Sequence, residues 1–172
     1  MDKQTIDALS AEIYNYNEKA GWWDNRSIKT ALMLVITEIA EATEGERKGL
    51  MDDHLPHRKM GEVELADALI RMLDVGGRLN FTYTKGPVLL NYENIFEAHF
   101  SLCKLVTGVY IEYANDPYFS SGEYSYFIDA IFIISEHFNY DVKSAMYEKL
   151  EYNKTREDHK RENRAKKGGK KV

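Results

Sequence analysis

The chain has 172 residues, of which 30% are charged and 44% hydrophobic, and its formal net charge is −5. This length suits one globular domain with a buried core, and the single cysteine excludes an internal disulfide bond. The negative charge argues against nucleic-acid binding, which a basic surface favours. No apolar run resembles a signal peptide or approaches the roughly 18 residues that span a bilayer, so we expect a cytoplasmic protein without membrane contact.

Helical periodicity begins near the N-terminus. In residues 3–19, apolar side chains recur every three or four positions, which predicts an amphipathic helix. Ser27 or Asn25 is a suitable N-cap for a second helix over 27–48. The six apolar residues 31–36 cover every direction around the axis of that second helix. We therefore expect it to be central and buried on all sides.

The remaining pattern is also helical. Further helices are predicted over 57–80, 92–115, 123–138 and 141–157, the last with Asp141 as its N-cap, and each of the three prolines falls in a loop between helices. No strand pattern or internal repeat is evident. The sequence therefore predicts an all-α helical bundle over residues 1–157. Residues 158–172 form a basic polar tail, which we expect to be solvated and frayed.

Two short acidic motifs stand out. Glu38 and Glu41 lie near the end of the second helix, and Glu64 and Asp67 follow after a gap of 22 residues. Each pair shares one helix face, and buried carboxylates are costly unless they are paired or metal-bound. We therefore expect the two pairs to face each other around cations. The alternative is that they are ordinary solvent-facing acids.

The type of ligand narrows the choice of cation. Oxygen-only ligands favour Mg²⁺, with Mn²⁺ as a close substitute. Di-iron bundles use Glu-x-x-His, and no glutamate of this chain has a histidine three residues later. Because Mg²⁺ held by carboxylates most often acts on phosphates, phosphoryl chemistry is indicated. A Gly-rich phosphate-binding loop is absent from the sequence.

The acidic motifs, together with three other segments, resemble the MazG-like all-α nucleoside triphosphate pyrophosphohydrolases. The other segments are Gly21-Trp22-Trp23-Asp24, Lys149-Leu-Glu-Tyr-Asn-Lys-Thr-Arg156 and the Gly-Gly-Lys-Lys ending. The resemblance implies a MazG-like bundle that hydrolyses an NTP or dNTP between the α and β phosphates with two or three Mg²⁺ or Mn²⁺ ions. It also implies a homodimer or homotetramer, and residues 92–115 would be an added helix. Phage-encoded members serve viral nucleotide metabolism, which would suit this short chain.

The expected site has three parts. Glu38, Glu41, Glu64 and Asp67 would hold the ions, with Glu38 and Glu41 as catalytic carboxylates and Glu38 as the favoured proton acceptor. On the last helix Lys149, Asn153 and Arg156 share a face that suits a triphosphate, unless this is merely a solvated helix end. Base or sugar contacts are predicted for Asn17, Trp22, Trp23 and Arg71, with one of the adjacent tryptophans in the core.

Arg71 also bears on the choice of substrate. Pyrimidine-specific relatives have an aromatic residue four positions after the last acid of the second motif, whereas this chain has Arg71. We therefore favour a purine, with (d)GTP ahead of (d)ATP. Two alternatives stay open: a dimeric dUTPase- or dCTPase-like pyrimidine nucleotide hydrolase, and a non-catalytic helical interaction protein.

Overall fold

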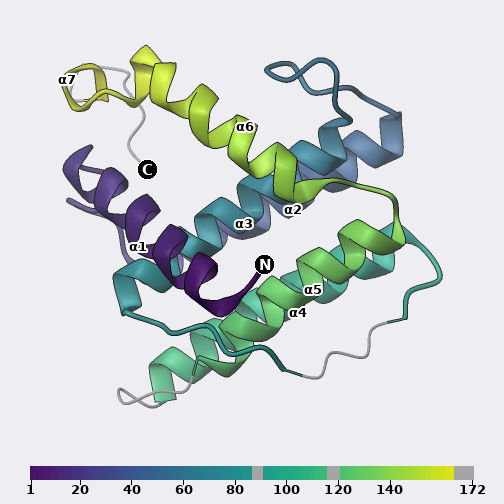
Figure 1. Ribbon diagram of the computed structural model, residues 1–172, viewed down its shortest axis with the longest axis horizontal. Helices are drawn as coiled ribbons and strands as arrows, with labels where there is room; N and C mark the ends of the chain where they lie inside the picture. Colours follow the sequence, from purple (N-terminus) through teal and green to yellow (C-terminus); the bar gives the residue numbers. More distant parts are fainter. Residues whose placement is uncertain (87–90, 116–120, 165–172) are drawn as a thin grey trace.

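The computed structural model describes residues 1–86, 91–115 and 121–164. In these residues the helices are α1 (Lys3–Lys19), α2 (Ile28–Lys48), α3 (Met60–Leu79), α4 (Ile95–Asn115), α5 (Gly122–His137) and α6 (Val142–Thr155), followed by the 3₁₀ turn η1 (Glu157–His159) and the short α7 (Arg161–Arg164) (Figure 1). One isolated bridge, between Met51 and Lys59, is the β structure found in this part of the chain. The prediction of an all-α fold is confirmed. No helix in the described residues is long and apolar enough to cross a membrane.

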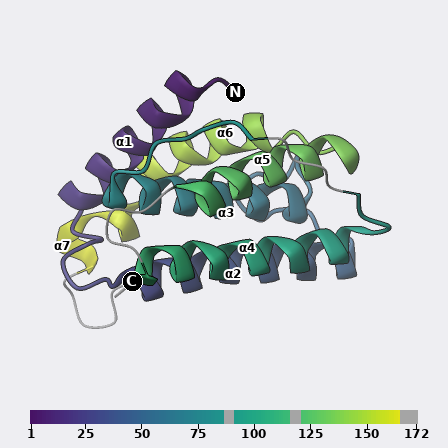
Figure 2. The same ribbon diagram turned by 90° about the horizontal axis from the view of Figure 1, so that it is seen from below.

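Helix α3 is the centre of the bundle. It packs against α1, α2, α5 and α6, and Figure 2 shows it between a layer of α2 and α4 on one side and α1 and α6 on the other. Fourteen of its 20 residues are buried. A helix in this position can present functional side chains to several neighbours at once.

The expectation that the second helix is central and buried on all sides is wrong. Helix α2 packs against α3 and α4, and this leaves one face open, where Met33 is 57% exposed. The run of apolar residues therefore reflects two packed faces and one exposed apolar face. The helix predicted over 92–115 begins at Ile95 and covers part of α2.

Two adjacent glycines let neighbouring helices approach α3 closely. A Cβ atom on Gly76 would lie 2.5 Å from the ring of Tyr124 in α5, and one on Gly77 would lie 2.5 Å from the backbone oxygen of Ser10 in α1. Any side chain at these positions would push α1 or α5 away from α3. The glycines therefore determine how closely α1 and α5 approach this end of α3.

Caps set the ends of the helices. Ser27, rather than Asn25, caps α2 because its Oγ accepts from the Thr30 N–H at 3.1 Å. Asp141 caps α6 as predicted. Helix α3 begins at Met60, three residues later than predicted, because Asp52 accepts from the N–H groups of His54 and Leu55 and holds the preceding segment in turns.

The first part of the predicted tail is packed rather than frayed. Arg161 pairs with Asp24 at 2.6 Å, and Arg164 donates to the backbone oxygen of Ala20 at 2.9 Å. These contacts hold η1 and α7 against the loop between α1 and α2. The expectation of a frayed tail is therefore wrong for 158–164. Residues 165–172, including the Gly-Gly-Lys-Lys ending, lie outside the described residues.

Candidate functional site

Three of the four predicted metal ligands come together between α2 and α3. Each of Glu38, Glu41 and Glu64 offers a carboxylate oxygen, and these oxygens lie within 4.8 Å of one another. Glu38 and Glu64 are buried, whereas Glu41 is exposed. Asp67, the fourth predicted ligand, lies outside this group of three, which we call the acidic trio.

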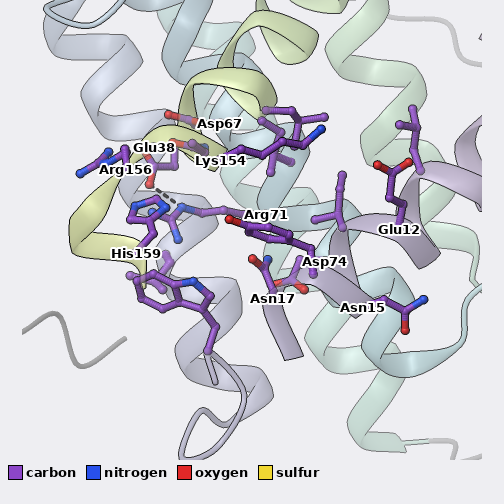
Figure 3. A pocket seen from close by; sticks show the side chains of 18 of the residues that line it. Glu12, Asn15, Asn17, Glu38, Asp67, Arg71, Asp74, Lys154, Arg156 and His159 are labelled. Atoms are coloured by element: carbon purple, nitrogen blue, oxygen red, sulfur yellow. Dashed lines mark hydrogen bonds and ion pairs between the residues drawn. The ribbon is translucent and has the colours of Figure 1, made fainter. Parts of the chain in front are cut away.

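Two basic side chains lie against the four acids. The Nε of Arg71 donates to Oε1 of Glu38, and Lys149 of α6 pairs with Asp67 at 2.9 Å. Figure 3 shows Arg71 reaching from α3 toward Glu38. Without metal, the negative charge of the site is therefore partly compensated by the protein's own cations.

Burial and mutual repulsion change the proton affinities of these acids. Burial, followed by the charge of Asp67, raises the pKa of Glu64 to about 9. Burial and the neighbouring Glu38 also raise the pKa of Glu41. Burial raises the pKa of Asp67 despite the opposing charge of Lys149. The metal-free site therefore retains protons that a divalent cation would displace.

The acidic trio fits a hard divalent cation in its ligand type. Its donors are carboxylate oxygens, which suit Mg²⁺ and Mn²⁺. Two oxygens on one Mg²⁺ lie at most about 4.2 Å apart, because each Mg–O bond is about 2.1 Å long. The three carboxylate oxygens lie within 4.8 Å of one another, which is close to this limit.

A pocket of about 780 Å³ opens beside the acidic trio. Its walls come from α1, α2, α3, α6 and η1, and both Glu38 and Glu41 line it, as does Asp67. Figure 3 shows Glu38, Asp67 and Arg156 at one end, with Asn17 and Asp74 farther along. This volume falls within the range of small-molecule sites.

The pocket contains most of the remaining predicted site residues. Asn17, Trp22, Arg71, Asn153 and Arg156 all line it. Three predicted residues, Glu64, Lys149 and Trp23, do not belong to its lining.

The role predicted for Lys149 does not match its position. Its side chain is 4% exposed and holds Asp67. Burial lowers its pKa most strongly, but the charge of Asp67, the hydrogen bond to Asp67 and the charges of Asp52 and Glu64 together outweigh burial, and the net shift is upward. Lys149 is thus a charged anchor behind the pocket rather than a free cation within it.

The adjacent tryptophans lie in different surroundings, as predicted. Trp23 belongs to the hydrophobic core and donates its indole N–H to Asp74 at 2.9 Å. Trp22 lines the pocket, where the guanidinium of Arg164 lies 3.5 Å from its ring centroid and His159 meets it edge-on at 5.3 Å. Residues from the predicted tail therefore complete the wall around Trp22.

Several pocket residues were not predicted as site residues. Among them are Glu12, Arg26, Asp74, Lys154 and His159. Asp74 has a weak signal in the sequence, because it follows Asp67 and Arg71 on one face of α3. Arg26 lies in the loop between α1 and α2, where no periodic pattern shows its direction. His159 lies in the segment that was expected to fray.

Comparisons of the chain with models of protein families, with curated proteins and with solved structures found no match in any of the three.

Proposed function

We propose that this protein is a Mg²⁺- or Mn²⁺-dependent nucleoside triphosphate pyrophosphohydrolase of the MazG-like kind. Its substrate would be a (d)NTP, with (d)GTP favoured, and its products the monophosphate and pyrophosphate. The observation that carries the proposal is the acidic trio, two of whose members, Glu38 and Glu41, line a pocket large enough for a nucleotide.

Polar groups beside the acids support a phosphate ligand. Lys154 and Arg156 line the pocket near the carboxylates. The Oδ1 of Asn153 is buried without a hydrogen-bond partner among the described residues, although its side chain also lines the pocket. Cationic and amide groups beside a metal-binding cluster suit the charge of a triphosphate. Lys149 would act indirectly, by holding Asp67.

The chemistry follows from this arrangement. Bound divalent ions would neutralise the triphosphate and lower the pKa of a water molecule. The water oxygen forms a bond to the α phosphorus while the bond from that phosphorus to the α–β bridging oxygen breaks. Pyrophosphate leaves with the bridging oxygen, and the proton of the water passes to a carboxylate. Arg156 and Lys154 orient the charged chain for this attack.

Glu41 is a better proton acceptor than Glu38, the residue favoured from sequence. Glu38 is engaged by Arg71, whose Nε donates to Oε1 of this carboxylate. Glu41 has no hydrogen bond or ion pair within the described parts of the chain, and its pKa is raised by burial and by Glu38. We therefore assign proton acceptance to Glu41.

A homodimer or homotetramer is part of the proposal. Phe96, Phe100 and Ile111 recur on one face of α4 at helical spacing and are 45%, 77% and 54% exposed. Exposed apolar faces are suited to contact with another subunit. Size-exclusion chromatography with light scattering measures the assembly. A monomer for both the native chain and Phe100→Glu would refute this part.

The function is tested by incubating the protein with each common NTP and dNTP in Mg²⁺ or Mn²⁺. Pyrophosphate is assayed separately from orthophosphate. We expect metal-dependent release of pyrophosphate. Orthophosphate as the direct product would refute cleavage between the α and β phosphates, and comparable cleavage of dUDP would favour the dUTPase-like alternative.

Two matched variants separate catalysis from folding. Glu41→Gln should lower turnover by about 100-fold or more, because it removes a ligand and the proton acceptor. Glu44→Gln, one turn later in α2, should leave turnover unchanged because Glu44 pairs with Arg47 and Lys48 on the surface. Equal turnover in both variants, with intact helical circular dichroism, would refute the role assigned to Glu41, and an absence of turnover in the folded native protein would favour the non-catalytic interaction protein.

A further inference from the structure

An arginine and an aspartate form a buried pair in the wall of the pocket. The side chains of Arg26 and Asp74 are 6% and 5% exposed, and Nη1 of Arg26 lies 3.6 Å from Oδ2 of Asp74. Both residues line the pocket. Figure 3 shows Asp74 beside Asn17, away from the end that holds Glu38 and Asp67. The pair therefore occupies a different end of the pocket from the acidic trio.

The pair retains unused hydrogen-bonding capacity. The Nε of Arg26 is buried with no partner among the described residues, and the 3.6 Å separation from Asp74 is too long for a good hydrogen bond. An unsatisfied buried donor is destabilising, and burial lowers the pKa of Arg26 to about 10. A guanidinium in this state is suited to an acceptor atom of a ligand.

Asp74 is held in place, but its carboxylate can still accept further hydrogen bonds. Its Oδ1 accepts from the indole N–H of Trp23 at 2.9 Å, and the side chain of Asn17 also bonds to the carboxylate. Because a carboxylate has about four acceptor positions, it can take further N–H groups. Trp23 and Asn17 thus fix the orientation of Asp74 while leaving it able to bind a ligand.

Aromatic surface borders the same region. The guanidinium of Arg26 lies 5.2 Å from the ring centroid of Trp22 and 5.5 Å from that of Trp23. Such contacts hold the planar guanidinium in a fixed direction. A planar heterocycle beside Trp22 would therefore meet a fixed donor and a fixed acceptor next to each other.

We propose that Arg26 and Asp74 form a base-reading subsite that selects guanine. Guanine presents the O6 acceptor beside two donors, N1–H and the N2 amino group. Arg26 donates to O6, and Asp74 accepts from N1–H and N2–H. Adenine presents an amino donor where guanine has O6, and an unprotonated ring nitrogen where guanine has N1–H. Both contacts are then lost, because a donor faces Arg26 and an acceptor faces Asp74.

This inference rests on the proposed function and deepens it by naming the residues that select the base, but its test requires neither metal nor hydrolysis. Binding of dGMP, dIMP, dAMP and N1-methyl-dGMP to the metal-free protein is measured by isothermal titration calorimetry. We expect dGMP to bind at least about tenfold more tightly than dAMP and N1-methyl-dGMP, with dIMP between them because it lacks the N2 amino group. Equal affinities for dGMP and N1-methyl-dGMP would overturn the proposal.

Variants then assign the contacts. Arg26→Met and Asp74→Asn should each remove the preference for dGMP over dAMP. Arg78→Met is the matched control, because Arg78 also lies over Trp23 at 5.6 Å but is not among the residues that line the pocket, and it should keep the preference. Retention of the preference in both pocket variants would refute the assignment. If a variant fails to fold, the four-nucleotide series on the native protein still decides the proposal.

The outcomes also separate this inference from the proposed function. Pyrophosphate release from all NTPs, without any preference for guanine in binding, would refute the subsite and leave the hydrolase. Selective dGMP binding without pyrophosphate release would support the subsite and refute the hydrolase.

Discussion

The Nε of Arg71 in α3 donates a hydrogen bond to Glu38 in α2. A cation that lines the pocket is therefore paired with a carboxylate of the acidic trio. The side chain of Arg71 is 36% exposed and that of Glu38 8%. The sequence suggested a different role for Arg71, in contact with a base or sugar. In the metal-free protein Arg71 is instead the cationic partner of Glu38, a partner that Glu38 does not have within α2.

Removal of this cation should strengthen metal binding. In Arg71→Met, Glu38 no longer has to leave an ion pair to bind a divalent ion, so Mn²⁺ should bind about two- to fivefold more tightly. Titration of free Mn²⁺ by electron paramagnetic resonance measures this change. Arg78→Met, distant from the acidic trio, serves as the control. Weaker Mn²⁺ binding in Arg71→Met than in the control would show that Arg71 does not compete with the metal.

Glu64 should make the metal-free protein less stable as pH rises. Its pKa is about 9 in the folded protein, against 4.5 in the unfolded chain, so between these values the unfolded chain releases a proton that the folded protein keeps. The free energy of unfolding should therefore fall from pH 5 to pH 9, by up to about 1.4 kcal/mol per pH unit. Urea denaturation in a chelator measures this dependence.

Glu64→Gln cannot ionise and should flatten that dependence, so the variant should exceed the native protein in stability at pH 8. It should also lose metal binding, since an amide is a weaker ligand than a carboxylate. Glu44→Gln is the control. A native protein whose stability is constant over this range would contradict the assignment to Glu64.

Lys149→Met should destabilise the fold. It leaves the carboxylate of Asp67 without its buried partner, and loss of one member of a buried ion pair costs about 3 to 5 kcal/mol. Lys154→Met should cost less than about 1 kcal/mol, because Lys154 pairs with Glu151 on the surface. Urea denaturation compares the two variants. Equal stabilities would indicate that Lys149 acts only on a ligand.

Partial recovery in the double variant Asp67→Asn/Lys149→Met would assign the loss to the pair itself. Independent effects of the two substitutions would instead add.

Arg164 should shield Trp22 from solvent. Its guanidinium lies 3.5 Å from the centroid of the Trp22 ring, and Trp22 is 8% exposed. Arg164→Ala should increase quenching of tryptophan fluorescence by acrylamide. Arg78→Ala, which removes the cation over Trp23 instead, should have a smaller effect because Trp23 is enclosed in the core. Unchanged quenching in Arg164→Ala would mean that this contact does not cover Trp22.

The sequence by itself determined the helices and the placement of the two acids of each motif on one helix face. Periodic apolar residues, caps such as Ser27 and the loop prolines depend on local geometry, so the all-α fold and most helix bounds could be predicted. The spacing within each acidic motif likewise fixed that Glu38 and Glu41 share a face, since residues three apart on a helix are neighbours.

Only the tertiary structure decided which helix is central and which charges meet. Helix α3 rather than α2 is central, since it packs against α1, α2, α5 and α6, and its glycines admit α1 and α5 closely. Lys149 pairs with Asp67, Arg71 with Glu38, and Arg26 with Asp74. Each pair joins different segments of the chain, and such contacts depend on how the helices pack. Periodicity places a residue on a face but does not specify what that face will meet.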